Sequence, residues 1–175
     1  MPNWCKNEVT VQADDRGKAE AFVDFVRDGD NYFSFNQIVP MPDELKDTNC
    51  PSKIVSQEEY DSLIPPHLVR KILRLPSPTT HTSDIGKPIT QEMSDRFNKE
   101  FGCDNWFDWR VQNCGTKWPA NCPELTIDDF GGVTYEFDTA WNPPEAICHA
   151  LRERFPDLNI SWFFREDGME MAGYL

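Results

Sequence analysis

Thiol and imidazole groups are the side chains of this sequence best suited to nucleophilic catalysis. The chain has six cysteines and three histidines. Cys114, in a polar loop, is the best candidate nucleophile, and it would need a lowered pKa and a general base nearby. His67, His81 and His149 are scattered along the chain, and no nucleophile elbow or recognised Cys/His signature is present. An enzyme that uses the cysteine of the 114–118 loop is therefore an alternative only, and no catalytic residue is assigned.

The spacing of the cysteines does not favour a metal site. Structural zinc sites use close cysteine pairs, whereas Cys103, Cys114 and Cys122 are separated by ten and seven residues. We expect no metal and no cofactor. The N-terminal segment lacks the basic and apolar regions of a signal peptide, and the longest apolar runs are far too short for a membrane helix. We therefore expect a cytoplasmic protein with reduced thiols and no membrane association.

Negative charge dominates the composition and is unevenly distributed. The chain has 30 Asp and Glu against 17 Lys and Arg, a net charge of −13, which argues against direct nucleic-acid binding because such proteins neutralise phosphates with basic side chains. Residues 118–150 contain no Lys or Arg. The acidic face predicted there comprises Glu124, Asp128, Asp129, Glu136 and Glu145. It serves either solubility or the imitation of a phosphate backbone towards a basic partner.

Aromatic side chains and one lysine suggest a recognition surface. Aromatic and cationic residues are common in binding hot spots. The candidate binding residues are Trp4, Asn36, Lys117, Trp118, Asp138 and Trp141. The simpler alternative is that the tryptophans anchor a long insertion to the sheet, and that Lys117 and Asp138 form an ordinary ion pair.

Hydrophobic periodicity predicts a repeated strand–helix–strand order. Strands are predicted at 7–13, 32–39, 132–140 and 158–165, helices at 18–27 and after Pro143–Pro144, and a short strand at 169–175. This βαβ-βαβ order, with antiparallel pairing, predicts an α+β, ferredoxin-like fold. Aromatic residues on the strands are expected to face the two helices as core rather than to stack on RNA bases, and these are Phe35, Tyr135, Phe137 and Trp162.

A long segment between the two halves has a different, proline-rich texture. We predict a single domain, 1–175, with a first βαβ half at 1–42, a helical and loop insertion at 43–130 and a second βαβ half at 131–175. Within the insertion, apolar spacing predicts helices at 66–75 and 90–101. The segment 77–87 between them is expected to be an exposed loop.

Four motifs in this order resemble one known family. They are Met1–Asn7 (MPNWCKN), Phe35–Pro42 (FNQIVPMP), Gly115–Trp118 (GTKW) and Phe137–Pro144 (FDTAWNPP). They look like the YubB ferredoxin-like domain family of small phage and plasmid proteins, with Cys114 standing where Trp is expected. The resemblance supports the ferredoxin-like fold and implies a mobile-element origin, but it supplies no catalytic residues.

Taken together, these features predict a non-enzymatic accessory or binding protein of a phage or plasmid. Its expected partner is a protein encoded by the host or by the element. The alternatives are an acidic, DNA-mimicking inhibitor of a host defence system and the cysteine enzyme described above.

Overall fold

The computed structural model describes residues 3–63, 86–129 and 131–175. These residues form two compact units. The first unit consists of the described residues within Met1–Pro40 and Val111–Leu175, and the second of those within Met41–Arg110. The sequence boundaries at 42 and 130 remain a prediction.

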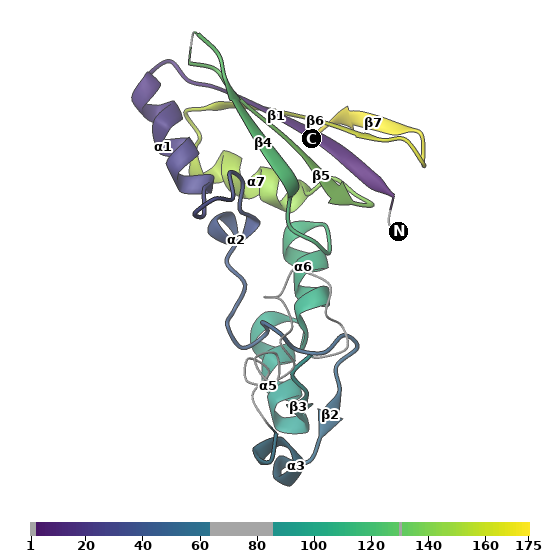
Figure 1. Cartoon of the computed structure of the whole chain (residues 1–175). Helices are drawn as coiled ribbons and strands as arrows, with labels where there is room; N and C mark the ends of the chain where they lie inside the picture. Colours follow the sequence, from purple (N-terminus) through teal and green to yellow (C-terminus); the bar gives the residue numbers. More distant parts are fainter. Residues whose placement is uncertain (1–2, 64–85, 130) are drawn as a thin grey trace. The chain divides into compact units, whose positions relative to one another are not determined.

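A five-stranded antiparallel sheet forms the centre of the first unit (Figure 1). Its strand order is β4-β5-β1-β6-β7, with β1 paired antiparallel to both β5 and β6. The strands are β1 (Trp4–Gln12), β4 (Asn121–Ile127), β5 (Val133–Ala140), β6 (Asn159–Glu166) and β7 (Met171–Tyr174). The first four strands have the pairing of a ferredoxin-like sheet, and β7 extends one edge. The predicted α+β, ferredoxin-like fold is confirmed.

Two helices cover one face of this sheet (Figure 1). Helix α1 (Arg16–Val26) begins where the Asp15 side chain accepts a hydrogen bond from the Gly17 N–H, and it buries Ala19, Phe22 and Val26. Helix α7 (Glu145–Arg154) follows Pro143–Pro144 as predicted and buries an apolar stripe, namely Ile147, Cys148 and Leu151. Each stripe repeats at three- and four-residue intervals, so it lies on one side of its helix.

The core between the sheet and these helices is rich in aromatic rings. Tyr135, Phe137 and Trp162 point from β5 and β6 towards the helices and are buried, as predicted. Phe33 packs against all three, with ring centroids 4.9 to 5.9 Å away. The contacts to Tyr135 and Trp162 are edge-to-face and the contact to Phe137 is stacked, and both geometries are favourable for aromatic pairs.

The strand predicted at Tyr32–Val39 is wrong. The chain there makes a turn and a short helix, α2 (Phe35–Ile38). The Ser34 N–H donates to the carbonyl oxygen of Val26 at 2.7 Å, and Phe33 and Phe35 are both buried. The second strand of the fold is β4 instead, which pairs with β5. Core packing of two aromatic residues, spaced two apart, produced the same alternation as a half-buried strand.

The second unit is built around short elements. They are β2 (Ile54–Val55), α3 (Gln57–Asp61), β3 (Ile89–Thr90) and α5 (Gln91–Phe101), and α6 (Trp106–Cys114) leads from this unit back into the first. The predicted helix at 90–101 is confirmed as α5, whose cap is the Thr90 side chain accepting from the Met93 N–H. The helix predicted at 66–75, and most of the 77–87 loop, lie outside the described residues.

Candidate functional site

The sheet of the first unit has a second face that points away from α1 and α7. Along β1 the exposed side chains alternate with buried ones, which follows from the two-residue period of a strand. Trp4, Lys6, Glu8 and Gln12 are exposed, with Thr10 half-buried. We call the side chains of this surface, from all five strands, the open face. Within this unit, no described helix packs on it.

Strand register arranges the open face in rows. Residues directly opposite each other on neighbouring strands point to the same side, with Cβ atoms about 4.5–5.5 Å apart. One row is Asn121, Asp138, Lys6 and Arg165, the next is Glu124, Glu136, Glu8, Phe163 and Tyr174, and the third is Thr126, Thr134, Thr10 and Ser161. Strands that lie far apart in the sequence therefore bring glutamates together in the second row and hydroxyl side chains together in the third.

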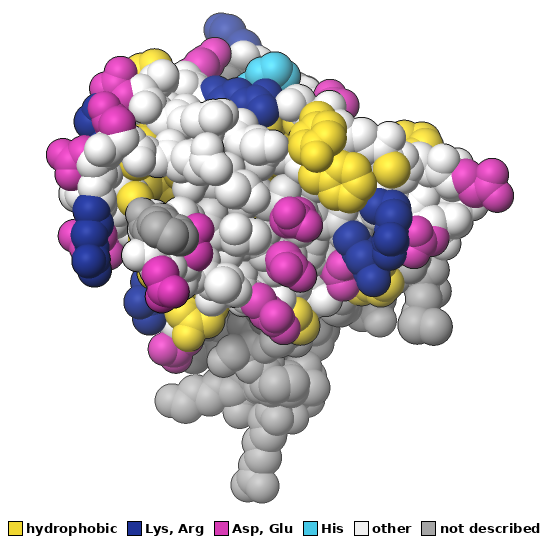
Figure 2. All heavy atoms as spheres, turned by 90° about the horizontal axis from the view of Figure 1, so that it is seen from above, with side chains coloured by type: hydrophobic (Ala, Val, Ile, Leu, Met, Phe, Trp, Pro, Cys, Tyr) yellow, Lys and Arg dark blue, Asp and Glu magenta, His cyan; other side chains and the backbone are white. Residues whose placement is uncertain are grey.

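Three carboxylates stand opposite one another in the second row. Glu8 is the register partner of Glu136, and Glu136 is the partner of Glu124. We call these three residues the glutamate row. Figure 2 looks onto this face and shows carboxylates near its middle, with hydrophobic and basic side chains beside them. Like charges directly opposite each other destabilise a sheet, so this row has an energetic cost.

Several predicted binding residues meet at the start of β1. The rings of Trp4 and Trp118 lie 5.8 Å apart, and the Lys117 ammonium lies 4.0 Å from the Trp118 ring centroid. The Thr116 hydroxyl donates to the carbonyl oxygen of Ala140 at 3.0 Å, which fixes this loop to the end of β5. The tryptophan pair thus anchors the loop, yet Trp4 remains 37% exposed. Trp4 can therefore anchor the loop and also contact a binding partner.

The other three predicted binding residues are dispersed. The Trp141 side chain is 45% exposed at the end of β5, and the backbone N–H of Trp141 donates to the carbonyl oxygen of Asn3. Asp138 lies in the first row opposite Lys6; burial raises its pKa, and the Lys6 charge offsets part of this rise. Asn36 lies on α2, a helix on the covered side of the sheet (Figure 1). It is therefore not part of the open face.

The predicted acidic face is divided among three places. Glu124 and Glu136 lie in the glutamate row, and Glu145 lies in the first turn of α7. Asp128 and Asp129 line a groove of about 410 Å³ between α1 and the β4–β5 turn. The groove also has apolar walls, formed by Ala19, Val23, Ile127 and Val133.

Three residues of the second row were not predicted from the sequence. Glu8, Phe163 and Tyr174 extend the second row across β1, β6 and β7. The alternation in β1 does place Glu8 on an exposed face. Which residues lie opposite Glu8 depends on the strand register, and no local pattern in the sequence predicts the register.

Most of the cysteines are buried, and none of the six is in a disulfide. Cys5, Cys103, Cys114 and Cys148 are buried, and Cys122 is exposed. Burial raises the pKa of the Cys5 thiol to about 11 and raises the pKa of Cys103 and Cys148 as well. Raised pKa values leave these thiols protonated and weakly nucleophilic at neutral pH.

The described residues contain neither a metal-binding cluster nor a membrane-spanning helix. In residues 3–63, 86–129 and 131–175, no group of three or more His, Cys, Asp or Glu side chains could hold a metal ion. No helix in the same part of the chain is long and apolar enough to cross a membrane.

Comparisons with known proteins concern the fold. Residues 121–175 match the family model described as a ferredoxin-like domain in Api92-like protein. The crystal structure of a protein api92 from Yersinia pseudotuberculosis is 13% identical, with a TM-score of 0.45, over 99% of this chain and 93% of that one. A search of curated proteins finds no match.

Proposed function

We propose that this chain is a non-enzymatic binding protein that engages a protein partner through the open face of its sheet. The observation that carries this proposal is the exposure of aromatic side chains on that face beside ordered rows of charge. Trp4 is 37% and Tyr174 is 73% exposed. Large exposed aromatics with neighbouring charges are typical of interaction hot spots.

Burial of the candidate nucleophile supports binding over catalysis. Cys114 has no exposed surface at the end of α6. A nucleophilic thiol must reach its substrate and have a base beside it. A substrate would have to displace core packing to reach Cys114, which disfavours the cysteine enzyme.

The further attribution to a phage or plasmid rests on the four sequence motifs that resemble the YubB family. It makes the partner a host protein or one encoded by the same element. The loop that holds one of these motifs, Gly115–Trp118, is also the loop joined to the open face through Trp4 and Trp118. This coincidence supports a shared recognition surface.

Affinity capture from nuclease-treated bacterial lysate tests the proposal. Trp4→Ala and Tyr174→Ala should each lose a partner that the wild-type chain captures. The matched control is Tyr32→Ala, because Tyr32 is also exposed but follows α1 on the covered side of the sheet. Retention of all captured proteins by both open-face variants, with native circular dichroism, would exclude the open face as the binding surface.

The glutamate row favours a second candidate, an acidic mimic of DNA that inhibits a host defence protein. Three aligned carboxylates imitate a run of phosphates, whereas Lys6 and Arg165 in the neighbouring row weaken the imitation. A mimic should bind a DNA-binding partner, lose affinity steeply with salt and be displaced by duplex DNA. A complex that is insensitive to both salt and DNA would exclude mimicry and leave the first proposal intact.

A further inference from the structure

The second row of the open face is acidic on β4, β5 and β1 and becomes aromatic on β6 and β7. Glu8, at the end of the glutamate row, is the register partner of Phe163, and Phe163 is the partner of Tyr174. The two rings lie 5.3 Å apart at an angle of 59°. A carboxylate and two aromatic rings therefore lie next to one another on an exposed surface.

These three residues line a cavity. It has a volume of about 350 Å³, and its remaining walls are the polar side chains of Thr10, Gln12, Asn159 and Ser161. This volume falls within the range of small-ligand pockets. Among the described residues that line the pocket, Glu8 is the only charged one, so it gives the pocket a negative charge.

The glutamate row adds to this negative charge. Glu136 and Glu124 continue from Glu8 across two further strands. Among the ion pairs of the described residues, none includes any of these three carboxylates. The nearest cations on the face, Lys6 and Arg165, lie one row away, roughly 7 Å along the strands. Arg165 is also held by Asp167 at 2.9 Å.

We propose that this pocket binds a cationic side chain, a guanidinium or ammonium group presented by the protein partner. The proposal rests on the proposed function and names the chemistry that the open face recognises. A cation there would pair with the Glu8 carboxylate while lying against the faces of Phe163 and Tyr174, which adds a cation–π interaction. It would also relieve the repulsion within the glutamate row.

Competing occupants fit the pocket less well. An anion would be repelled by three carboxylates. A neutral polar ligand could bond to the hydroxyl and amide walls, but it would leave the carboxylate row without a counter-charge. A cation would interact favourably with both the aromatic rings and the glutamate row.

NMR titration of the full-length chain with N-acetyl-arginine methylamide tests this proposal. Amide shifts should change at Glu8, Phe163 and Tyr174, and the neutral citrulline analogue should bind at least about fivefold more weakly. The affinity should fall between about 20 mM and 300 mM salt. Absence of shifts at these residues, or equal binding of the citrulline analogue, would overturn the proposal.

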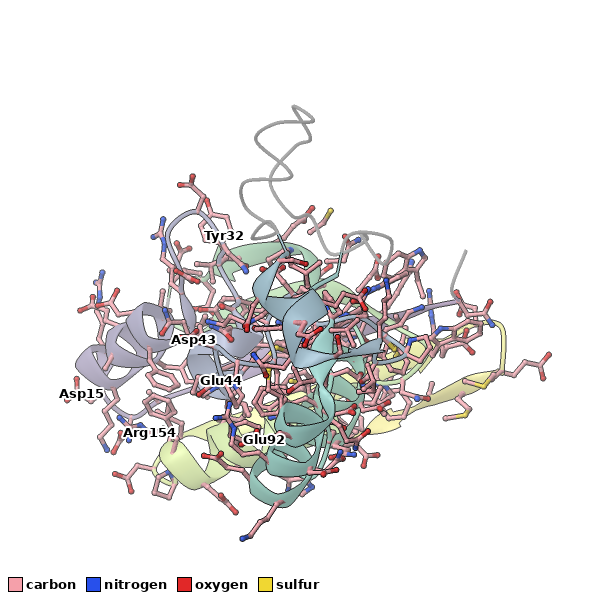
Figure 3. All side chains as sticks on the ribbon, turned by 90° about the horizontal axis from the view of Figure 1, so that it is seen from below. Asp15, Tyr32, Asp43, Glu44, Glu92 and Arg154 are labelled. Carbon is pink, nitrogen blue, oxygen red and sulfur yellow. The ribbon has the colours of Figure 1, made fainter. Side chains whose placement is uncertain are left out.

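Matched variants separate the pocket from general charge effects. Glu8→Gln should weaken arginine binding about threefold to fivefold, and Tyr174→Leu about twofold to fivefold. The controls are Tyr32→Leu, at an exposed position that follows α1, and Glu44→Gln, at an exposed position of the second unit; both residues are labelled in Figure 3. Equal effects of the control and pocket variants would contradict the assignment. Dispersed amide spectra verify that each variant is folded.

The two proposals fail in different ways. If the open face binds no protein, Trp4→Ala retains every captured partner. If only the cation pocket is wrong, Trp4→Ala still loses the partner while Glu8→Gln retains it.

Discussion

The indole N–H of Trp162 donates a hydrogen bond to the side-chain oxygen of Asn7, 3.1 Å away, within the aromatic core. The Asn7 amide in turn donates to the Thr139 hydroxyl and to the backbone oxygen of Cys5, both at 2.9 Å. Asn7 thus joins β1 to β5 and β6 through side chains. Because buried polar groups are costly without partners, this network favours one strand register over its neighbours.

Replacing Asn7 by Leu should lower the free energy of unfolding by about 2–4 kcal/mol, because the Trp162 N–H and the Thr139 hydroxyl both lose a partner. Urea denaturation measures the loss. Trp162→Phe removes the indole donor, so the double variant should be less destabilised than the sum of the two single variants. Strict additivity would show that the two side chains are not coupled.

Replacing Phe33 by Ala should lower the free energy of unfolding by about 3–5 kcal/mol, although the residue lies in neither a helix nor a strand. Its ring is fully buried and packs against Tyr135, Phe137 and Trp162. The neighbouring Tyr32→Ala change should cost less than about 1 kcal/mol, because Tyr32 is 41% exposed. Similar losses for both variants in urea denaturation would contradict this assignment of the core.

The Tyr135 hydroxyl is buried and has no hydrogen-bond partner among the described residues. Burial also raises the pKa of this phenol. Tyr135→Phe keeps the ring contacts and removes the unpaired group, so it should raise the free energy of unfolding by about 1 kcal/mol. Tyr32→Phe should have little effect. A destabilised Tyr135→Phe variant would reveal a partner for the hydroxyl.

Stability should fall at alkaline pH, in part through Cys5. An unfolded thiol ionises near its ordinary pKa of 9, whereas burial raises the pKa of Cys5 to about 11. The unfolded state therefore releases this proton first, so the stabilisation present below pH 9 is lost as the pH rises towards about 11. Urea midpoints on both sides of this range measure the loss, and Cys5→Ala should reduce it. An unchanged pH dependence in that variant would assign the loss to other groups.

Relieving the glutamate row should stabilise the sheet. Glu136 is opposed by Glu8 on one side and by Glu124 on the other, so Glu136→Gln should raise the free energy of unfolding by about 0.5–1 kcal/mol at low salt. The gain should shrink near 1 M salt, where screening is strong. Glu44→Gln in the second unit serves as the control. A salt-independent gain would show that repulsion is not its cause.

The local patterns of the chain predicted most helices and strands of the first unit correctly. The alternation in residues 132–140 predicted β5, and the apolar stripe of residues 18–27 predicted α1. The segment at Tyr32–Val39 shows the limit of this reasoning. Two buried phenylalanines, two residues apart, satisfy a strand pattern as well as the turn and short helix that the core packing selects.

Strand β4, which completes the sheet, was not predicted because its sequence lacks a strand pattern. Strand β4 has mostly exposed side chains, contains Pro123 and is irregular in register between Asn121 and Glu124. An edge strand tolerates proline and irregularity because one of its sides needs no ladder bonds. Its weak alternation therefore gave no strand signal.

The amino-acid sequence by itself determined the acidic charge, the local elements and which side chains of β1, β5 and β6 face the core, because these depend on composition and on short-range periodicity. Only the tertiary structure decided which strand lies beside which. Pairing brings Glu124, Glu136 and Glu8 into one row and places Phe163 and Tyr174 at its end. Register depends on contacts between residues far apart in the chain, and a slip of one residue would turn each side chain to the other face.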